Sequence, residues 1–449
     1  MRAVGGLPEG WDPELCSAPP THGPMNQESL PSPGAVRAER ALAPDETPSA
    51  AEPTAPADRL DVLDALRGVA LFGILAVNLT YWFRDHPSRS VLDPDLFRGV
   101  ADRAAEFAVI TFFNGKFLTL FAMLFGAGLA LQREHALARG GGFHGRALRR
   151  LAVLLLFGVA HVGLLWMGDV LHVYALLGPL LLLFLGCTTR TLTFWAALVF
   201  ALPPILVTCR LVVGGLARAV PPVEELESAR QHVEVALQVY GHGGWLEVAR
   251  YRIHDYVQYL PTLLPAAYAA FGSFLVGVLV WRSGVVQEPA RHRASLRRML
   301  IGGLVLGVGV TLLEGTMSQR VPSGWRGLVD LVSAFQPAVY VAQALAYGAG
   351  VLLLLQRPGW GARFSWVTAA GRMALSCYLL QSLLCGIIFY GYGFGLYGHL
   401  GPAAGLLVVF GIYAVELALS RWWLSRYRFG PLEWLWRTLT YGKRQPMRS

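Results

Sequence analysis

Long apolar runs alternate with short polar connectors from about residue 60 to the end of the chain. Ten runs are long enough to cross a membrane, because about 20 mostly apolar residues span a hydrocarbon layer of ~30 Å. Backbone groups in lipid need internal hydrogen bonds, and no run alternates as a barrel strand does, so the pattern predicts helices. We expect an all-α, polytopic bundle of about ten transmembrane helices. Its predicted cores are Leu63–Phe83, Phe107–Leu131, Leu148–Met167, Val170–Gly186, Leu192–Val213, Leu263–Trp281, Leu296–Leu313, Leu328–Leu355, Val367–Tyr390 and Ala403–Trp422.

Composition supports the membrane interpretation. The chain is 54% hydrophobic and 15% charged, whereas about 25% of a soluble domain is charged. The net charge of +9 comes without a basic stripe interleaved with aromatic residues, so we expect the lipid bilayer, and no nucleic acid, as partner. The connectors Arg133–Arg150 and Arg282–Arg298 carry five arginines each. The positive-inside rule then predicts that both termini are cytoplasmic.

The chain divides into a tail and a membrane domain. Residues 1–57 contain eleven prolines and are predicted to be a disordered cytoplasmic tail. Residues 58–442 form the transmembrane domain, and residues 443–449 form a basic tail. Within the domain, residues 214–262 read as an external amphipathic segment that lies on the membrane or caps the bundle.

One histidine is the most informative candidate for chemistry. His161 lies in the apolar run Leu151–Met167, and an ionisable group within a span normally faces protein or water. Asp169 follows the run, and His172 and Tyr174 open the next one. A histidine beside a carboxylate makes a usable general base, since its ordinary pKa of about 6.5 is close to working pH. Two alternatives stay open: Asp169 as a helix cap alone, and His161 as a satisfied core histidine.

Two arginines lie at a similar depth on the predicted inner side. Arg67 is in the first run, three residues after Asp64, and Arg372 opens the ninth. A guanidinium fork suits a phosphate or carboxylate, so both are candidates for binding an anionic cofactor. The alternative is that each side chain extends to the membrane surface independently. Asn78, near the outer end of the first run, is a candidate for binding a substrate, as are His172 and Tyr174.

Lys116 is the third candidate for cofactor binding. It lies about nine residues into the second run, or roughly 13 Å at 1.5 Å per residue, and a charge at that depth needs a partner or a water-filled cavity. A structural ion pair and a ligand contact are both open. A further alternative is that Asn114-Gly115 breaks the helix and leaves Lys116 nearer the external interface.

We expect no metal and no permanently bound cofactor. The histidines, cysteines and carboxylates show no ligand spacing, and the five cysteines read as small apolar residues. No phosphate-binding loop of the G-x-x-x-x-G-K-[ST] kind is present, so direct use of ATP is not expected.

Several motifs in order resemble the YeiB family of bacterial inner-membrane proteins, whose C-terminal part, residues 280–442 here, is a domain of unknown function. The resemblance covers residues 58–442. Its carriers are LDVLDALRGVALFGILAVN, NGKFLTLFAMLFGAG, GVAHVGLLWMGDVLHVYALLG, YGHGGWLEVARYR, AGRMALSCYLLQSLLCGIIFYGYGFGL and FGPLEWLWRTLTYG. The resemblance implies a multi-pass protein of the bacterial inner membrane.

The YeiB family is distantly similar to transmembrane acyltransferases, in which about ten helices with an arginine-bearing first span present acyl-CoA to an acceptor. Many of those enzymes have a catalytic histidine at or just after the first span. This chain departs from them, since it has Asn78 and then His86 there, and we interpret His86 as an exposed loop residue. His161 takes the catalytic role in our hypothesis on chemical grounds alone.

The sequence therefore predicts an acyltransferase that moves an acyl group, acetyl in the first instance, from a cytoplasmic acyl-CoA to a small-molecule, glycan or lipid acceptor near the outer face. Arg67, Arg372 and Lys116 would bind the donor, and His161 oriented by Asp169 would be the base. One alternative is a secondary transporter or exporter of a small molecule that uses His161, Asp169 and Lys116 as a proton relay. A further alternative is a non-catalytic membrane scaffold. The oligomeric state is left open.

Overall fold

A computed structural model describes residues 61–93, 96–97, 99–214, 223–320, 322 and 325–448. The predicted tail, residues 1–57, lies outside the described residues. Within them every regular element is a helix, apart from one isolated bridge between Tyr427 and Arg448. The prediction of an all-α helical bundle is confirmed.

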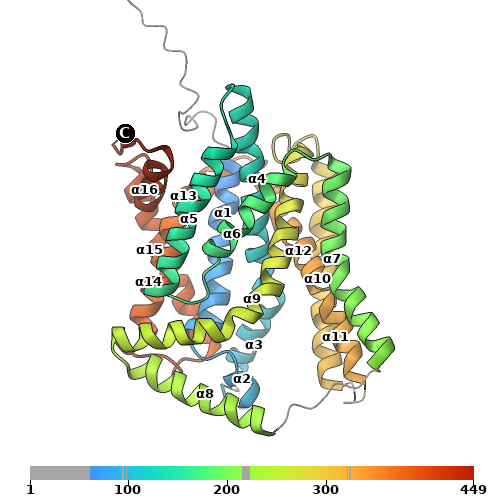
Figure 1. Cartoon of the computed structure of the whole chain (residues 1–449), viewed down its shortest axis with the longest axis vertical. Coiled ribbons are helices and arrows are strands. Elements are labelled where there is room, and N and C mark those ends of the chain that lie inside the picture. Colours follow the sequence, from blue (N-terminus) through green and yellow to red (C-terminus); the bar gives the residue numbers. More distant parts are fainter. Residues whose placement is uncertain are drawn as a thin grey trace, which may run out of the picture. The chain divides into compact units, whose positions relative to one another are not determined.

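Figure 1 shows the order and arrangement of the helices. The first half of the chain forms α1 (Asp61–Asn78), the short π-helical segment η2 (Leu79–Phe83), α2 (Arg89–Leu92), α3 (Val100–Ala108), the π-helical segment η3 (Val109–Phe113), α4 (Lys116–Ala138), α5 (His144–Leu164), α6 (Leu171–Phe184) and α7 (Thr189–Gly214). The second half forms α8 (Val223–His242), α9 (Trp245–Arg282), α10 (Arg293–Arg320), α11 (Arg326–Ala334), α12 (Gln336–Leu355), α13 (Trp360–Arg372), α14 (Ala374–Phe389), α15 (Pro402–Leu424) and α16 (Pro431–Tyr441).

Eight helical segments of the described chain are long and apolar enough to cross a membrane, which makes this a multi-pass membrane protein. They are Asp61–Phe83, Val100–Ala138, His144–Leu164, Thr189–Gly214, Leu263–Arg282, Arg293–Met317, Gln336–Leu355 and Pro402–Leu424. All eight overlap predicted crossings.

The other two predicted crossings differ from simple spans. The run Val367–Tyr390 is not one helix, because α13 and α14 meet at an angle of 78°. The run Val170–Gly186 is α6, whose 14 residues cover only about 21 Å at 1.5 Å per residue. Hydropathy along the sequence identified both runs as apolar. It gave no information on the bend between α13 and α14 or on the short length of α6.

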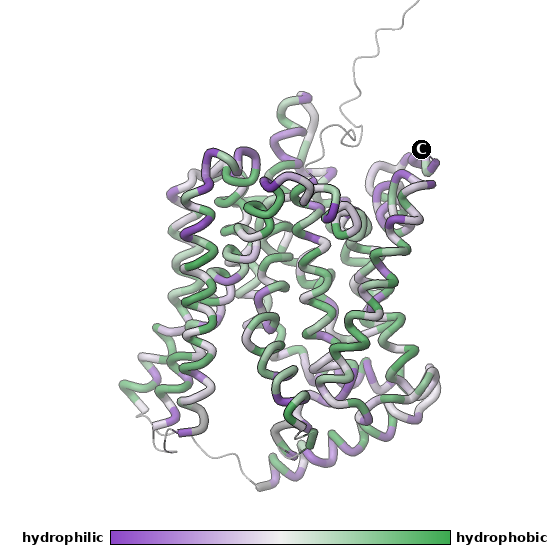
Figure 2. Tube along the Cα trace, turned by 180° about the vertical axis from the view of Figure 1, so that it is seen from behind, coloured by the Kyte–Doolittle hydropathy of each residue, from purple (hydrophilic) through white to green (hydrophobic). Residues whose placement is uncertain are grey.

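The polar connectors divide between the two ends of the bundle. In Figure 1 the connectors α4–α5 and α9–α10 and helix α16 lie at the upper end, whereas α2, α8 and α11 lie at the lower end. Figure 2 shows mainly apolar helix between these ends. Both arginine-rich connectors are thus at the end that carries the C-terminus, an arrangement that agrees with the positive-inside pattern.

The described part of residues 214–262, the segment predicted to be external and amphipathic, includes α8 and the first half of α9; residues 215–222 lie outside the described residues. Helix α9 is 38 residues long, with Pro261 and Pro265 inside it, and prolines are a usual cause of helix bending. Its first half runs across the lower end of the bundle before the helix turns upward (Figure 1). Arg252 of this half forms a hydrogen bond with Gly163 of α5, and Tyr256 forms one with His172 of α6.

Helices α1 and α13 cross in direct backbone contact. A Cβ on Gly371 would overlap the carbonyl oxygen of Asp64, so only glycine permits this approach. The crossing brings Arg67 of α1 and Arg372 of α13 to the same cavity.

Candidate active site between α5, α6 and α14

A buried carboxylate between α5 and α6 holds two imidazoles. His161 Nδ1 lies 2.8 Å from Asp169 Oδ1, and His172 Nδ1 lies 2.7 Å from Asp169 Oδ2. The three residues are only 1%, 2% and 6% exposed, respectively. A buried carboxylate is stable as an anion only when it is paired and hydrogen-bonded, and here each of its oxygens has an imidazole partner.

The local sequence explains how this cluster forms. Helix α5 ends at Leu164 and α6 begins at Leu171, so only six residues connect the two helices in a tight hairpin. Asp169 Oδ2 also accepts the backbone N–H of His172 in the first turn of α6, at 2.8 Å, as a helix-capping carboxylate does. A Cβ on Gly158 would overlap the backbone nitrogen of His172 and lie 2.8 Å from Asp169 Oδ2. Gly158 therefore lets the hairpin close, and Asp169 both caps α6 and binds His161.

The second ring nitrogen of His161, Nε2, is not held by Asp169. With Asp169 accepting at Nδ1, the ring proton stays on Nδ1 and the lone pair stays on Nε2. His161 Nε2 is buried and has no hydrogen-bond partner among the described residues. The His161 ring centroid lies 5.1 Å from that of Tyr378 in α14 and 6.3 Å from that of Trp166. The imidazole that carries this nitrogen is therefore next to the Tyr378 ring.

The amphipathic half of α9 covers the cluster on the other side. Tyr256 Oη lies 3.0 Å from His172 Nε2, which extends the hydrogen-bonded chain to Tyr256, His172, Asp169 and His161. Arg252, which is 1% exposed, donates to the carbonyl oxygen of Gly163 at 3.2 Å.

A cavity of about 270 Å³, which we call the arginine cavity, extends from the arginine-rich end of the bundle toward this cluster. Four arginines from four different helices line it: Arg67, Arg150, Arg372 and Arg437. Its walls include apolar side chains of α4, α5 and α6, among them Phe121, Leu124, Phe125, Leu154 and Leu171. Tyr174 and Tyr378 also line it, and the His161 ring packs against the Tyr378 ring. The cavity is cationic where it meets the connectors and apolar toward the histidine.

Helix α16 forms one side of the cationic part. Trp436 Nε1 donates to the carbonyl oxygen of Arg150 at 2.9 Å, and the guanidinium of Arg150 lies 3.7 Å from the Trp436 ring centroid. On the opposite side Arg67 binds Asp64 at 2.5 Å. Burial lowers the pKa of Arg437, although an arginine keeps its charge in proteins.

The bend between α13 and α14 is held by a carboxylate of α16. Glu433 accepts the backbone N–H groups of Leu375 and Ser376 at 2.7 and 3.0 Å and the Ser376 hydroxyl at 2.6 Å. It therefore binds the exposed N–H groups at the start of α14, where a negative charge is favoured. Burial raises the pKa of Glu433. Arg372, the last residue of α13, lies directly before this bend.

The structure places Lys116 apart from Arg67 and Arg372, the other two residues predicted to bind a cofactor. Asn114 and Gly115 break the helix before α4, with Gly115 at φ 77°, so the helix-break alternative holds and Lys116 is the first residue of α4. Lys116 lines a different cavity, together with Val77, the neighbour of Asn78. Asn78 is half-buried at the end of α1.

His86 is not the exposed loop residue that the sequence indicated. It is half-buried, its Nδ1 accepts the N–H of Ser88 at 3.2 Å, and its ring centroid lies 5.4 Å from that of His232. The loop folds against α8, which could not be inferred from local sequence. Tyr174, by contrast, lines the arginine cavity and also donates to the carbonyl oxygen of Leu118 at 3.2 Å.

Sequence reasoning missed part of the cationic wall. From the sequence, Arg150 is placed only in an arginine-rich connector, and Glu433, Trp436 and Arg437 are assigned no role in a site. The signal for the three residues of α16 was the motif FGPLEWLWRTLTYG, which places Glu433 and Arg437 four residues apart on one helix face.

Comparisons with known proteins agree on one family. Residues 280–443 match the family described as "Protein of unknown function (DUF418)". The uncharacterized protein YxaH of Bacillus subtilis is 36% identical over 418 residues, which cover 89% of this chain and 98% of the relative. The uncharacterized protein YeiB of Escherichia coli is 31% identical over 405 residues, which cover 85% of this chain and 96% of the relative.

An uncharacterized 39.9 kDa protein of Bacillus acidopullulyticus is 27% identical over 399 residues, 88% of this chain and 98% of the relative. No solved structure matches the chain. With near full-length relatives above 30% identity and the matching C-terminal domain, the chain belongs to the YeiB family of multi-pass membrane proteins.

Proposed function

We propose that the protein is an inner-membrane acyltransferase that moves an acyl group, acetyl in the first instance, from a cytoplasmic acyl-CoA to a hydroxyl or amine near the outer face. One observation carries the proposal. A single cavity joins four arginines to Tyr378, and a buried histidine with a free Nε2 lies next to that tyrosine.

The donor would enter from the arginine-rich end. Coenzyme A carries several phosphates, and arginine binds phosphate in a bidentate, charge-assisted way. The cavity volume of about 270 Å³ lies just below the range of about 300–1,000 Å³ that is usual for ligand pockets. The cavity would therefore take the acyl group and its pantetheine arm, while the nucleotide stays at the cationic mouth.

His161 would then act as the general base. Its Nε2 takes the proton from the acceptor hydroxyl or amine, the acceptor atom attacks the thioester carbon, and the carbon–sulfur bond breaks. The proton passes from His161 to the departing coenzyme A thiolate, so the imidazole returns to its neutral form. Asp169 stabilises the transient imidazolium and holds the ring in the required tautomer, as the carboxylate of a Ser-His-Asp triad does.

Acetyl-CoA binding to the detergent-solubilised protein tests the donor site. Arg67→Ala, Arg372→Ala and Arg437→Ala should each weaken binding by about 1.5–3 kcal/mol, the contribution of a charge-assisted contact. Arg190→Ala removes an exposed arginine at the start of α7 and should bind as the wild type does. Equal affinity in all four variants would contradict the donor site.

The His161→Gln variant tests the chemistry separately. It should still bind acetyl-CoA, but release of the coenzyme A thiol in the presence of a bacterial membrane extract should fall by about 10²–10⁴-fold, the usual contribution of a positioned base. The rate is expressed per amount of monodisperse protein. A normal rate per folded molecule would remove His161 from the mechanism.

A proton-coupled transporter is the second candidate, and the hydrogen-bonded chain from Tyr256 through His172 and Asp169 to His161 favours it. Such a chain is what a proton relay within a membrane needs. Lys116 lies outside it, in a different cavity. Vesicles that accumulate a solute in response to a pH gradient, with no acetyl-CoA binding by the same protein, would favour transport over acyl transfer.

A further inference from the structure

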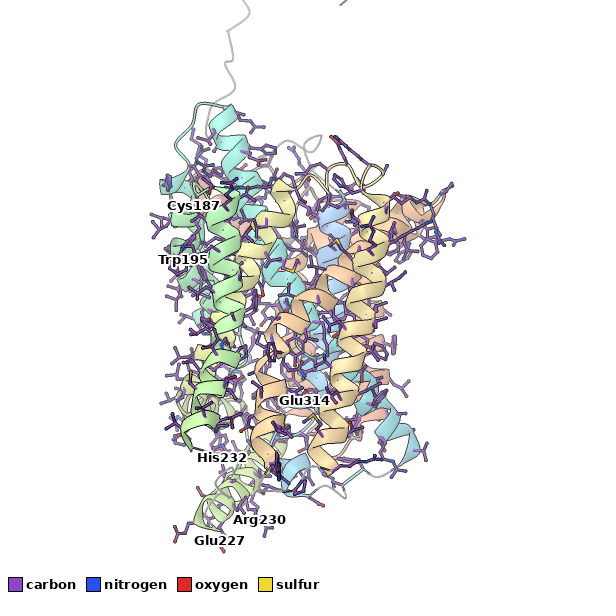
Figure 3. All side chains as sticks on the ribbon, turned by 90° about the vertical axis from the view of Figure 1, so that its right-hand side faces the viewer. Cys187, Trp195, Glu227, Arg230, His232 and Glu314 are labelled. Atoms are coloured by element: carbon purple, nitrogen blue, oxygen red, sulfur yellow. The ribbon has the colours of Figure 1, made fainter. Side chains whose placement is uncertain are left out.

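A second cavity, of about 600 Å³, lies between η2, η3, α10 and α12. Glu314, which lines it, is in the same half of the bundle as His232 and Arg230 of α8 and away from Cys187 (Figure 3). This outer cavity is therefore near the end of the bundle opposite the arginine-rich connectors.

Lys116 carries a buried charge on the wall of the outer cavity. The residue is 1% exposed, its Nζ donates to the carbonyl oxygen of Ile110 at 2.6 Å, and Nζ lies 4.9 Å from the Tyr340 ring centroid. No carboxylate among the described residues is close enough to form an ion pair with it. An ammonium within a span is costly unless it is neutralised, so the site favours an anionic group.

Glu314 supplies the opposite charge on the same cavity. Ser333 Oγ donates to one of its carboxylate oxygens and Gln336 Nε2 donates to the other. Both carboxylate oxygens of Glu314 are therefore held in place by side chains of α11 and α12. The cavity thus has a cation and an anion on its wall that do not pair with each other.

The rest of the lining suits a small polar molecule. Asn114 and Thr311 contribute hydrogen-bonding groups, and Tyr81, Trp82 and Tyr340 contribute aromatic rings. Aromatic faces attract ammonium groups, which adds to the attraction of Glu314 for a cation.

We propose that the outer cavity is a binding site for a small zwitterion of the amino-acid class, with its carboxylate on Lys116 and its ammonium group at Glu314. A ligand with only a carboxylate would leave Glu314 without an opposite charge, and a ligand with only an amine would leave Lys116 without one. This site does not depend on acyl transfer, because the arginine cavity and the outer cavity share no lining residue.

The two lysines of the chain provide a test variant and a matched control. Of the 38 basic residues, only Lys116 and Lys443 are lysines, and Lys443 is exposed in the C-terminal tail. Lys116→Met removes the ammonium and keeps the length of the side chain. Lys443→Met removes the same charge far from the cavity lining.

Thermal melting of the full-length, detergent-solubilised protein tests the proposal. The probes are the natural α-amino acids, β-alanine and 4-aminobutyrate, with propionate and propylamine as ligands of single charge. At least one zwitterion should raise the melting temperature in proportion to the logarithm of its concentration, as a ligand of the folded state does. Propionate and propylamine at the same concentrations should give smaller shifts.

The variants locate the effect. Lys116→Met and Glu314→Gln should each weaken binding of the zwitterion by at least about tenfold, the effect of losing one charge-assisted contact. Lys443→Met and Arg67→Ala should bind it as the wild type does. Glu314→Gln keeps a hydrogen-bonding side chain at that position, so it serves as the test if Lys116→Met does not fold. No shift with any zwitterion, or a full shift in Glu314→Gln, would overturn the proposal.

Discussion

At the scale of single residues, Asp169 unites two roles that the sequence left as alternatives. Its Oδ2 accepts the backbone N–H of His172 as a helix cap, and its Oδ1 binds His161. Both roles need the ionised carboxylate, because only an anion can accept from three donors at once. Removing Asp169 would therefore affect the hairpin and the histidine together, which makes His161→Gln the cleaner probe of chemistry.

His86 should make stability depend on pH. Burial and the nearby His232 lower the pKa of His86 to about 4, against an ordinary value of about 6.5. The unfolded chain therefore binds the proton more readily between these values. The stability that neutral His86 contributes is complete above about pH 6.5 and is lost as the pH falls toward 4, by at most about 3 kcal/mol.

The measurement is the melting temperature of wild type and His86→Asn between pH 7 and 4. The wild type should lose stability more steeply on acidification, because a proton on Nδ1 would break the bond from Ser88 N–H. His399→Asn, which alters an exposed histidine, should keep the wild-type slope. Equal slopes for wild type and His86→Asn would show that His86 is not buried in its neutral form.

At the scale of elements, the α5–α6 hairpin depends on close contact between two helices. Small residues permit such approach within membranes, and Gly158 is the residue at the contact. The same principle applies at Gly371, where α13 crosses α1. In both cases the glycine brings polar side chains of two helices to one place.

Gly158→Ala should disrupt the hairpin. The added methyl group would overlap the backbone of His172 and press on Asp169, and overpacking of this kind costs about 1–3 kcal/mol. Gly163→Ala, five residues further along α5, meets no atom within 4 Å and should be neutral or slightly stabilising, since alanine favours a helix over glycine. Melting temperatures of the two variants, measured side by side, give the comparison. A Gly158→Ala protein as stable as Gly163→Ala would mean that the helices are further apart.

At the scale of the whole bundle, the two cavities lie toward opposite ends. The arginine cavity is at the end with the α4–α5 connector and α16, and the outer cavity is toward the end with α8. The assignment of donor and acceptor sides depends on the orientation of the bundle.

Reporter fusions should establish that orientation. Fusions after Arg139, Gln287 and Arg448 should report the cytoplasm, and fusions near Arg230 and His399 should report the external side, because arginine-rich connectors are retained inside. Reporters of alkaline phosphatase and green fluorescent protein type, active on opposite sides, provide mutual controls. A cytoplasmic signal from the Arg230 fusion would reverse the orientation and place the arginine cavity outside.

What the sequence by itself determined was local. Hydrophobic runs predicted the helices because the length of a span is a property of a single segment. The cluster of His161, Asp169 and His172 could be anticipated because its members are three and eight residues apart on one tight hairpin. An ionisable group in such a run signals its environment without any knowledge of the neighbouring helices.

What only the tertiary structure decided was the contact of distant segments. Arg67 and Arg372 meet because α1 and α13 cross at Gly371, and Arg437 joins them because Glu433 of α16 holds the bend before α14. Lys116, like Arg67 and Arg372, is a basic residue within an apolar run, yet a helix break places it in another cavity. Hydropathy describes one segment at a time, whereas a cavity is formed by side chains of many helices whose relative positions depend on close packing.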